Sequence, residues 1–517
     1  MNFKLNYKKV LSVGIVFMFI TAFWYGYNSI VPKILTDKFG LSQVTSGAIM
    51  ALDNVLAVFL LPIFGSLSDK SRSKHGRRTP FIFWGTIISA LLLVGVSIAD
   101  YAQLQQLGEI SPTTQEAYVQ SLDELWEANP SFEYQKEQKP LHEHVSEQEF
   151  KQISMYQTDE NGKQSSMVTE EYTKIVVPAR QAYAKQLSNR QPINLIIFVA
   201  VLLLLLVAMG IFRSPAVALM PDVTIKPLRS QGNAMINLMG SLGVLFVLVL
   251  GMILGTGRPD RVLMDYRLFF GIIAIYMVAA LVAFLVLVKE KKWAAEMEAD
   301  TRQLQAEGVA FQSEEEQSGE RKLERGELIS LILILASVVL WYMGYNAMES
   351  KLSVYMSDAL GGIDYNIPYA IGGIMGIVSY FPIGKLSAVW GRKKTVLAGV
   401  AIMAAAFGVM CFVTTQTPVW VTYAVYAAVG ASWAAINVNS YPMVVELAKG
   451  SNVGKYTGFY YTASMSAQIV TPILCGVFLE IDMRTLFPYA TVCVLLAFFT
   501  MLFVKHGDAP ILKKKEH

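Results

Sequence analysis

The chain has 517 residues, of which 54% are hydrophobic and only 16% are charged, and its formal net charge is +3. A soluble protein of this length would carry about a quarter charged residues, so the composition excludes that class and indicates a polytopic protein of the lipid bilayer. The near balance of 43 basic and 40 acidic side chains gives no sign of a nucleic-acid partner, and the three cysteines all lie in apolar runs, so no disulfide framework is expected.

Twelve apolar runs are each long enough to cross a bilayer as a helix, which takes about 20 residues. We therefore predict an all-α protein with twelve transmembrane helices. The first six are predicted near residues 10–31, 44–66, 80–99, 193–216, 233–256 and 267–288. The second six are predicted near residues 328–348, 366–388, 394–414, 418–441, 457–479 and 485–504.

Two long polar stretches set the predicted domain boundaries. An N-terminal six-helix bundle takes residues 1–288, a C-terminal bundle takes 328–505, and 506–517 form a tail. Residues 289–327 are charged and mixed in sign, which is typical of a solvated linker with some amphipathic helix. Residues 100–191 form an acidic, Gln-rich segment between the third and fourth spans.

An internal repeat indicates that the 100–191 segment is an insertion. Tyr27-Asn28 in the first half matches Tyr345-Asn346 in the second, 318 residues later, whereas Asp222 matches Glu446 only 224 residues later. The difference between these two separations, about 94 residues, is nearly the length of the 100–191 segment. Its counterpart in the second half is only a short turn near residues 414–417. Extra length in a surface loop is tolerated easily, so a substrate-capturing lid and a dispensable cap both remain open.

A basic hairpin occurs in each half. The first is GSLSDKSRSKHGRRTPF, from Gly65 to Phe81, and the second is FPIGKLSAVWGRKKTVL, from Phe381 to Leu397. Basic turns stay on the cytoplasmic side of a membrane, so both hairpins and, with an even number of spans, both termini are predicted to be cytoplasmic. The 289–327 linker and the 506–517 tail are then expected to be cytoplasmic, and the 100–191 insertion extracytoplasmic. We expect a multi-pass protein of the plasma membrane.

Two six-helix halves in one orientation, each with such a hairpin, resemble the major facilitator superfamily over nearly the whole chain. The first hairpin reads Asp, six residues, Gly-Arg-Arg, one residue, Pro-Phe, which resembles the proton-coupled sucrose transporters and, more loosely, the glycoside, pentoside and hexuronide cation symporters. The segment from Arg213 to Gly243 is similar to their fourth-to-fifth helix region. The plant sucrose carriers hold an Arg where this chain has Val217, and Arg213 lies one helical turn earlier on the same face.

This resemblance implies transport by alternating access, in which two pseudo-symmetric halves rock around a central site. Asp69 ends the second predicted helix, where its carboxylate could accept hydrogen bonds from a neighbouring helix N-terminus and pair with Arg77 or Arg78. Such a latch would hold the cytoplasmic side shut. The alternative is that these charges only set the topology. The predicted cytoplasmic gate comprises Gly65, Asp69, Gly76, Arg77, Arg78, Asp222, Arg392 and Glu446.

Asp53 is predicted to couple transport to a cation. It lies about 24 Å along the helix from Asp69, near mid-membrane, where a carboxylate must be neutral, paired or beside water. We expect it to carry a proton, with Asn54 and Arg213 as neighbouring groups. Alternatively, Asp53 only fixes helix packing. The related symporters use carboxylates nearer the cytoplasmic end, where this chain has Ala57 and Leu61, so sodium coupling by that arrangement is not expected.

Sugars are bound by amides and carboxylates, with an aromatic face on which the ring stacks. Each polar group in a span could instead serve helix packing, but the mirrored Tyr-Asn pairs favour a binding role. The candidates are Tyr25, Tyr27, Asn28, Tyr345, Asn346, Glu349, Asn437, Asn439 and Gln468.

The sequence therefore predicts a monomeric secondary active transporter that takes up a sugar or glycoside together with a proton or another cation. An exporter of amphipathic compounds on the same fold is the nearest alternative, and a sensor that no longer transports is a third. No nucleotide-binding loop, metal cluster or nucleophile triad is recognisable, so no cofactor, no metal site and no enzyme activity are expected.

Overall fold

The computed structural model describes residues 5–108, 115–134, 137–158, 164–169, 171–256, 258, 261, 263–306, 323–358, 366–414, 416–448 and 453–508. Most of the predicted 506–517 tail and the middle of the predicted 289–327 linker lie outside these residues. The first part of the linker forms a helix, α11 (Glu290–Ala306).

Twelve helices occupy the twelve predicted spans. Those of the N-terminal half are α1 (Tyr7–Lys33), α2 (Gln43–Asp69), α3 (Thr79–Leu107), α8 (Ile193–Asp222), α9 (Arg229–Leu254) and α10 (Arg267–Leu287). Those of the C-terminal half are α12 (Arg325–Asp358), α13 (Asn366–Trp390), α14 (Arg392–Met410), α15 (Val419–Glu446), α16 (Val453–Ile481) and α17 (Leu486–Leu502). Among the described residues, ten helices are long and apolar enough to cross a bilayer, and α17 is a shorter apolar helix.

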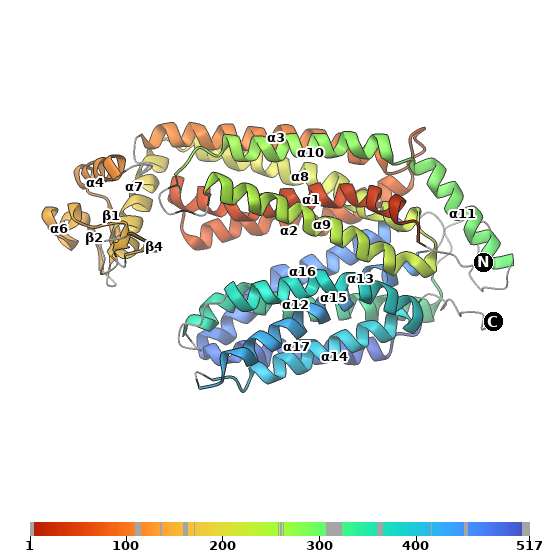
Figure 1. Cartoon of the computed structure of the whole chain (residues 1–517). Helices are drawn as coiled ribbons and strands as arrows, with labels where there is room; N and C mark the ends of the chain where they lie inside the picture. The colour runs from red at the N-terminus through yellow and green to blue at the C-terminus, as the bar shows by residue number, and fades with distance from the viewer. Residues whose placement is uncertain are drawn as a thin grey trace.

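The two halves use the same packing scheme, and Figure 1 shows them as two layers. In the N-terminal half α1 packs on α9 and α10, and α8 packs on α2 and α3. The corresponding helices of the C-terminal half repeat this pattern, with α12 on α16 and α17, and α15 on α13 and α14. The halves meet through α2 against α16 and α9 against α13, which are equivalent pairs. The predicted twofold repeat is therefore present in the packing.

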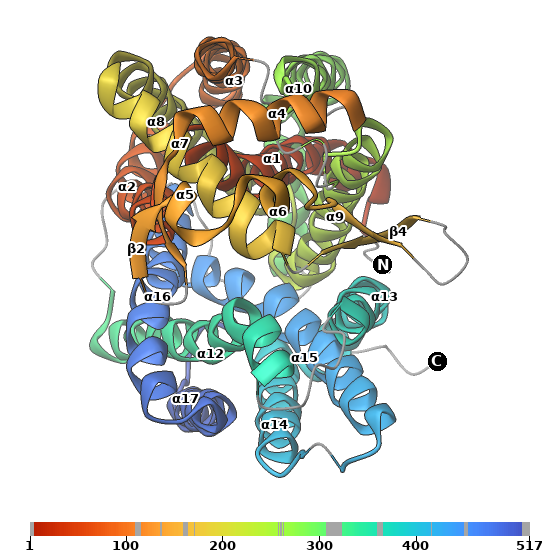
Figure 2. The ribbon, with the colours of Figure 1, turned by 90° about the vertical axis from the view of Figure 1, so that its left-hand side faces the viewer.

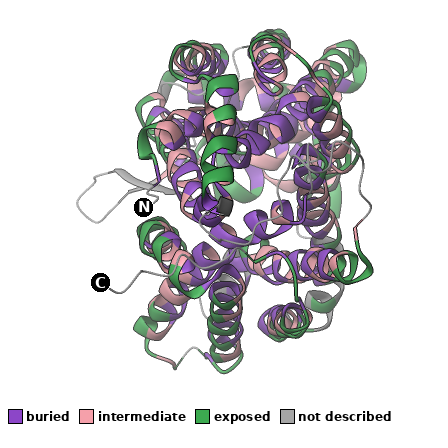
Figure 3. Ribbon diagram, turned by 90° about the vertical axis from the view of Figure 1, so that its right-hand side faces the viewer, coloured by how far each residue is buried: buried purple, intermediate pink, exposed green. Residues whose placement is uncertain are grey.

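Large apolar side chains cover the outside of the helices, where they would face lipid. Trp84, Leu91, Ile253 and Phe412 are all more than half exposed. Figure 3, which views the molecule from the end that carries both chain termini, shows exposed positions on the outer faces and buried positions between the helices. We call this end the terminal end. An aqueous solvent would not favour such a surface, whereas a bilayer does.

The third helix is longer than the predicted 80–99 span, because its polar residues find buried partners. Lys38, at the end of the π-helix η1 (Ile34–Lys38), places its ammonium 2.8 Å from both carboxylate oxygens of Asp100. Gln103 donates to the backbone oxygen of Lys38 at 2.9 Å. Both charged side chains are completely buried. The helix therefore continues through a polar segment that composition alone assigns to the insertion.

The insertion begins after α3 and forms a small unit with its own apolar core. It comprises α4 (Gln115–Ala128), β1 (Ser131–Tyr134), β2 (Glu137–Pro140), α5 (Leu141–His144), α6 (Glu147–Lys151), β3 (Tyr156–Thr158), β4 (Gln164–Val168), η2 (Tyr172–Val176) and α7 (Val177–Arg190). The strands pair as two antiparallel hairpins, β1 with β2 and β3 with β4. Leu141 and Phe150 are fully buried in its core.

The insertion lies at the end opposite the chain termini, mainly over the N-terminal half (Figures 1 and 2). Its helix α7 contacts η1 and α3. Gln181 donates to the carboxylate of Asp37 at 2.9 Å, and Gln106 donates to the backbone oxygen of Leu187 at 3.3 Å. These bonds attach the unit to the N-terminal half, so it would move with that half.

The buried Lys38–Asp100 pair generates a stability prediction. We expect Asp100→Asn to lower the free energy of unfolding by about 3–5 kcal/mol, because the ammonium of Lys38 would stay buried without its counter-ion. The double variant Lys38→Met/Asp100→Leu should recover most of this loss, since neither charge remains. Thermal unfolding in detergent measures both. Equal destabilisation by the single and double variants would contradict the argument.

Candidate functional site

Asp69 joins the two halves at the terminal end of the molecule. Its carboxylate accepts hydrogen bonds from the backbone N–H groups of Gly454, at 2.9 Å, and Lys455, at 3.0 Å. Both groups belong to the first turn of α16, whose N-terminus attracts negative charge. This is the kind of helix-terminus contact that the sequence predicts for Asp69.

Arg78 holds this carboxylate from within the N-terminal half. Its side chain is fully buried, and its guanidinium lies 2.5 Å from Asp69 and 2.8 Å from Asp222, at the end of α8. It also donates to the hydroxyl of Ser68 at 2.5 Å. Arg77 is more exposed and approaches Asp222 at 3.4 Å. Of the two predicted partners, Arg78 is therefore the one that binds Asp69.

Two predicted glycines are required by the backbone, Gly65 at this interface and Gly76 in the turn before α3. Gly65 of α2 packs directly on the backbone of Gly454, and a Cβ atom at either position would overlap the other residue's carbonyl. Gly76 has φ +122°, a conformation that other residues rarely adopt. The absence of side chains thus lets α2 and α16 approach closely and lets the chain turn before α3.

A second cross-half contact lies at the same end and is centred on Arg392. Its guanidinium donates to Glu446 at 2.9 Å, within the C-terminal half. It also donates to the hydroxyl of Ser230 at 3.0 Å and to the backbone oxygen of Lys226, both in the N-terminal half. Lys226 lies in the 3-10 helix η3 (Lys226–Leu228), before α9. The predicted gate residues therefore form two clusters, each of which bonds across the two halves.

Two carboxylates in these clusters were not predicted. Glu290 accepts hydrogen bonds from the backbone N–H groups of Arg78 and Thr79, each at 2.9 Å, at the start of α3. Asp508 accepts them from Arg392, at 2.8 Å, and Lys393, at 3.2 Å, at the start of α14. Each acid follows the sixth helix of its half and a Val-Lys pair. An acid within three residues of this Val-Lys pair in both halves is the sequence signal that could have identified them.

Asp53 lies in the middle part of α2 beside α1 and α8. It is half-buried, and its carboxylate interacts electrostatically with Arg213 and Tyr27, although no ion pair with Arg213 forms. Its one hydrogen bond among the described residues is from the backbone N–H of Asn54, at 2.5 Å. The guanidinium of Arg213 lies instead over Trp24, at 5.2 Å, and over Tyr461 of α16, at 5.1 Å. Arg213 thus bridges the two halves at this level through aromatic rings.

An aromatic group occupies the matching region of the C-terminal half. Tyr345 of α12 stacks on Trp433 of α15, with ring centroids 3.8 Å apart and an angle of 3°. Tyr342 meets the same indole edge-on at 5.1 Å. One turn along α12, Glu349 accepts a hydrogen bond of 2.9 Å from the hydroxyl of Tyr369 of α13. Sequence reasoning named Tyr345 and Glu349 but missed Trp433 and Tyr369, because aromatic residues are common in apolar spans.

The remaining predicted substrate residues are placed less uniformly. Tyr25 and Asn28 are exposed on α1, whereas Tyr27 is buried and stacks on Phe23. Asn439 is completely buried and donates to the backbone of its own helix at 2.9 Å. Asn346, Asn437 and Gln468 are half-buried, and the backbone oxygen of Asn437 accepts a 2.7 Å bond from Asn233. Asn439 thus has no exposed surface with which to bind a ligand in this conformation.

Potential metal ligands are dispersed among the described residues. Within the described residues, no three His, Cys, Asp or Glu side chains are grouped as metal ligands would be. The charged clusters at the terminal end are instead organised as ion pairs and helix caps, which suits a separable contact between two halves.

Comparison with known proteins gives two family matches. Residues 187–472 and 333–517 match the Major Facilitator Superfamily, and residues 12–100 match the family described as MFS/sugar transport protein. A putative glycoside/cation symporter of Escherichia coli, YagG, is 34% identical over 71 residues, which span 14% of this chain and 15% of that relative.

Solved structures with a similar fold cover nearly the whole chain. A bacterial homologue of the iron transporter ferroportin, in an outward-facing state, has a TM-score of 0.60 and 12% identity over 96% of this chain and 99% of its own. The proton:xylose symporter XylE has a TM-score of 0.57 and 14% identity, with 97% of each chain covered. FucP in the outward conformation has a TM-score of 0.54 and 12% identity, with 96% and 98% covered.

The Asp69 contact generates a prediction about the closed interface. We expect Asp69→Asn to open the terminal end, because the charge-assisted bonds to Arg78 and to the α16 N-terminus contribute about 1.5–3 kcal/mol each. A reporter cysteine at Ala234, which is fully buried at this interface, should then react about tenfold faster with a polar thiol reagent in an otherwise cysteine-free chain.

Asp482→Asn provides the matched control, because this exposed carboxylate lies beyond α16 at the other end. It should leave the reactivity of the reporter cysteine unchanged. Unchanged reactivity in Asp69→Asn would remove its role in closing the interface and leave only an effect on topology.

Proposed function

Since the chain belongs to the major facilitator superfamily, we propose that this transporter takes up a sugar or glycoside together with a proton. The match of residues 12–100 to sugar transport proteins supports the substrate class. So does the short similarity to a putative glycoside/cation symporter. The family and fold are those of membrane transporters and not of enzymes.

The proposal of proton coupling rests on the position of Asp53 within the membrane span and on its lack of an ion-pair partner among the described residues. A half-buried carboxylate in the middle part of a membrane span needs a proton, a partner or water, and no ion pair to Asp53 forms among the described residues. A carboxyl group that gains a proton from one side and loses it to the other would carry that proton across. Arg213, in the same region, would favour its release when substrate and contacts rearrange.

We propose that the terminal end faces the cytoplasm, in accord with its basic hairpins. The Asp69 and Arg392 clusters would then be the cytoplasmic gate, and their bonds would be complete when the transporter is closed on that side. Inward opening requires both clusters to separate together, because each one bonds the same two halves. Binding of substrate and proton would offset the loss of these bonds.

We propose that the sugar ring contacts the Trp433–Tyr345 stack of the C-terminal half. An aromatic face binds the apolar side of a sugar, and the carboxylate of Glu349 and the hydroxyl of Tyr369 lie one turn away to accept and donate hydrogen bonds. Asp53 and Arg213 would face the same region from the N-terminal half. A substrate that contacts both halves is one that their rocking motion can release.

The proton-carrier role of Asp53 is tested by separating accumulation from exchange. In proteoliposomes, we expect Asp53→Asn to abolish uphill sugar accumulation driven by a pH gradient while exchange of labelled for unlabelled sugar continues, because exchange moves no net proton. Asp482→Asn removes the same charge from an exposed carboxylate outside the membrane spans, and this control should retain both activities. Loss of exchange together with accumulation would indicate a packing role, and undiminished accumulation would end the assignment.

The aromatic contact is tested by two tryptophans on the same helix. Trp433→Ala should raise the sugar concentration for half-maximal uptake about three- to tenfold, since one stacking contact contributes roughly 0.5–1.5 kcal/mol. Trp420→Ala on the exposed outer face of α15 should change it little. The measurement is initial uptake against a panel of sugars and glycosides. Equal effects of the two substitutions would place the binding site elsewhere.

A further inference from the structure

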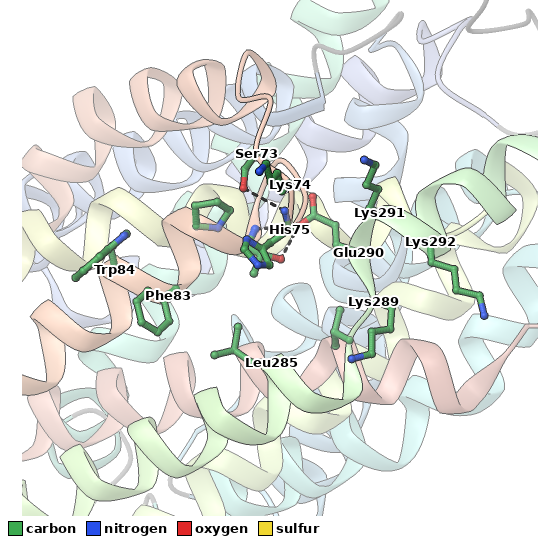
Figure 4. A pocket seen from close by; sticks show the side chains of 13 residues that line it. Ser73, Lys74, His75, Phe83, Trp84, Leu285, Lys289, Glu290, Lys291 and Lys292 are labelled. Carbon is green, nitrogen blue, oxygen red and sulfur yellow. Dashed lines mark hydrogen bonds between the residues drawn. The ribbon is translucent and has the colours of Figure 1, made fainter.

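A cavity of about 690 Å³ lies at the terminal end, on the N-terminal half and apart from the central residues described above. It is bounded by the turn after α2, the start of α3, the end of α10 and the start of α11 (Figure 4). Neither the proposed transport cycle nor the proposed sugar site uses this cavity.

The lining of the cavity divides into an apolar and a basic part. Phe83 and Trp84 of α3 and Leu285 of α10 supply the apolar part, and the indole of Trp84 is 61% exposed. The basic part is formed by Lys74, His75, Lys289, Lys291 and Lys292. Figure 4 shows Phe83 and Trp84 at one end of the cavity and Lys291 and Lys292 at the other. The apolar residues belong to membrane spans, whereas the basic ones lie just beyond them.

The charged side chains that line the cavity favour the binding of an anion. Its one acidic lining residue, Glu290, is engaged by the backbone of Arg78 and by both the backbone and the hydroxyl of Thr79. In the described part of the chain, no carboxylate lies within ion-pair distance of Lys74, Lys289 or Lys291, and Lys292 reaches Glu296 only at 3.9 Å. Several exposed ammonium groups therefore surround a space whose wall is apolar.

We propose that this cavity binds an anionic phospholipid, with the phosphate held by the lysines of the α10–α11 junction and an acyl chain laid along Phe83, Trp84 and Leu285. Basic groups beside the membrane attract anionic headgroups, with about 1 kcal/mol for each Lys or Arg near the surface. A soluble phosphate compound would match the lysines but leave the apolar wall uncovered. A lipid matches both parts, and with the orientation proposed above it comes from the cytoplasmic leaflet.

The position of the cavity connects the lipid to the gate. Lys289 and Lys291 flank Glu290, which caps α3 and bonds the backbone of Arg78. A bound headgroup fixes the segment that carries Glu290 and so favours the arrangement in which Arg78 holds Asp69. Anionic lipid would thereby stabilise the closed terminal end, independently of which sugar is transported.

The binding site is tested with the purified full-length protein in neutral detergent micelles. Brominated acyl chains quench the tryptophans that they contact, and Trp390 and Trp420 are also exposed, so both are first replaced by Phe. In this background brominated phosphatidylglycerol should give saturable quenching, which should be absent when Trp84→Phe is added. Brominated phosphatidylcholine should need an about tenfold higher concentration. Millimolar inorganic phosphate in place of lipid should leave the thermal stability of the protein unchanged, whereas phosphatidylglycerol should raise it.

The matched variants carry the same change in charge. Lys289→Gln/Lys291→Gln/Lys292→Gln should raise the half-saturating phosphatidylglycerol concentration about tenfold or more. The control Lys8→Gln/Lys70→Gln/Lys394→Gln removes three exposed lysines outside the cavity and should change it less than about twofold. Melting curves without lipid verify that each variant is folded.

Three results would overturn the proposal. Equal quenching by the two brominated lipids would make the site one for acyl chains of any phospholipid. An equal effect of the two triple variants would show that the overall positive charge of this face, and not the cavity, attracts the lipid. Saturable quenching that persists in Trp84→Phe would place the lipid at another tryptophan. None of these results would affect the proposed sugar transport, which is measured separately by uptake.

Discussion

The structure depends on one buried guanidinium at the contact between its halves. Arg78 lies between Asp69 and Asp222, and Asp69 in turn binds the N-terminus of α16 in the other half. Removal of one member of a buried ion pair costs about 3–5 kcal/mol, so these groups stay together while the interface is closed. Its cross-half bonds at the terminal end are polar, and Gly65 and Gly454 meet there through their backbones and not through interlocking side chains.

The two halves repeat the same packing but close the interface with different chemistry. In the first hairpin Asp69 stands four residues after Gly65, and in the second the equivalent position after Gly384 is Ala388. The C-terminal half compensates with Arg392, which reaches across to Ser230. Glu290 and Asp508 then cap the third helix of their respective halves. The result is a pseudo-symmetric pair of clusters. In one, a carboxylate of the N-terminal half accepts hydrogen bonds from the C-terminal half, and in the other a guanidinium of the C-terminal half donates hydrogen bonds to the N-terminal half.

The central region combines charge from one half with aromatic rings from the other. Asp53 and Arg213 belong to the N-terminal half, and the stacked Tyr345 and Trp433 belong to the C-terminal half. Arg213 contacts Tyr461 across the boundary. Asp53 interacts electrostatically with Arg213, so the charge of Asp53 acts on a side chain that contacts both halves. The insertion and the basic cavity both lie outside this region, on the N-terminal half. These two features are additions to the two helix bundles, and both belong to that half.

The sequence by itself determined the twelve spans, the twofold repeat and the position of the insertion, because apolar length and basic hairpins are local signals. It also named most of the charged residues that meet at the terminal end, whose role as a gate stays a prediction. It did not determine that Asp100 stays in a helix, since that depends on Lys38, which is distant in the chain. It also could not identify Glu290, Asp508, Trp433 or Tyr369, whose partners come from other helices. The tertiary structure alone decided these, because a single carboxylate or aromatic ring acquires its contacts only when separate helices pack and exclude water.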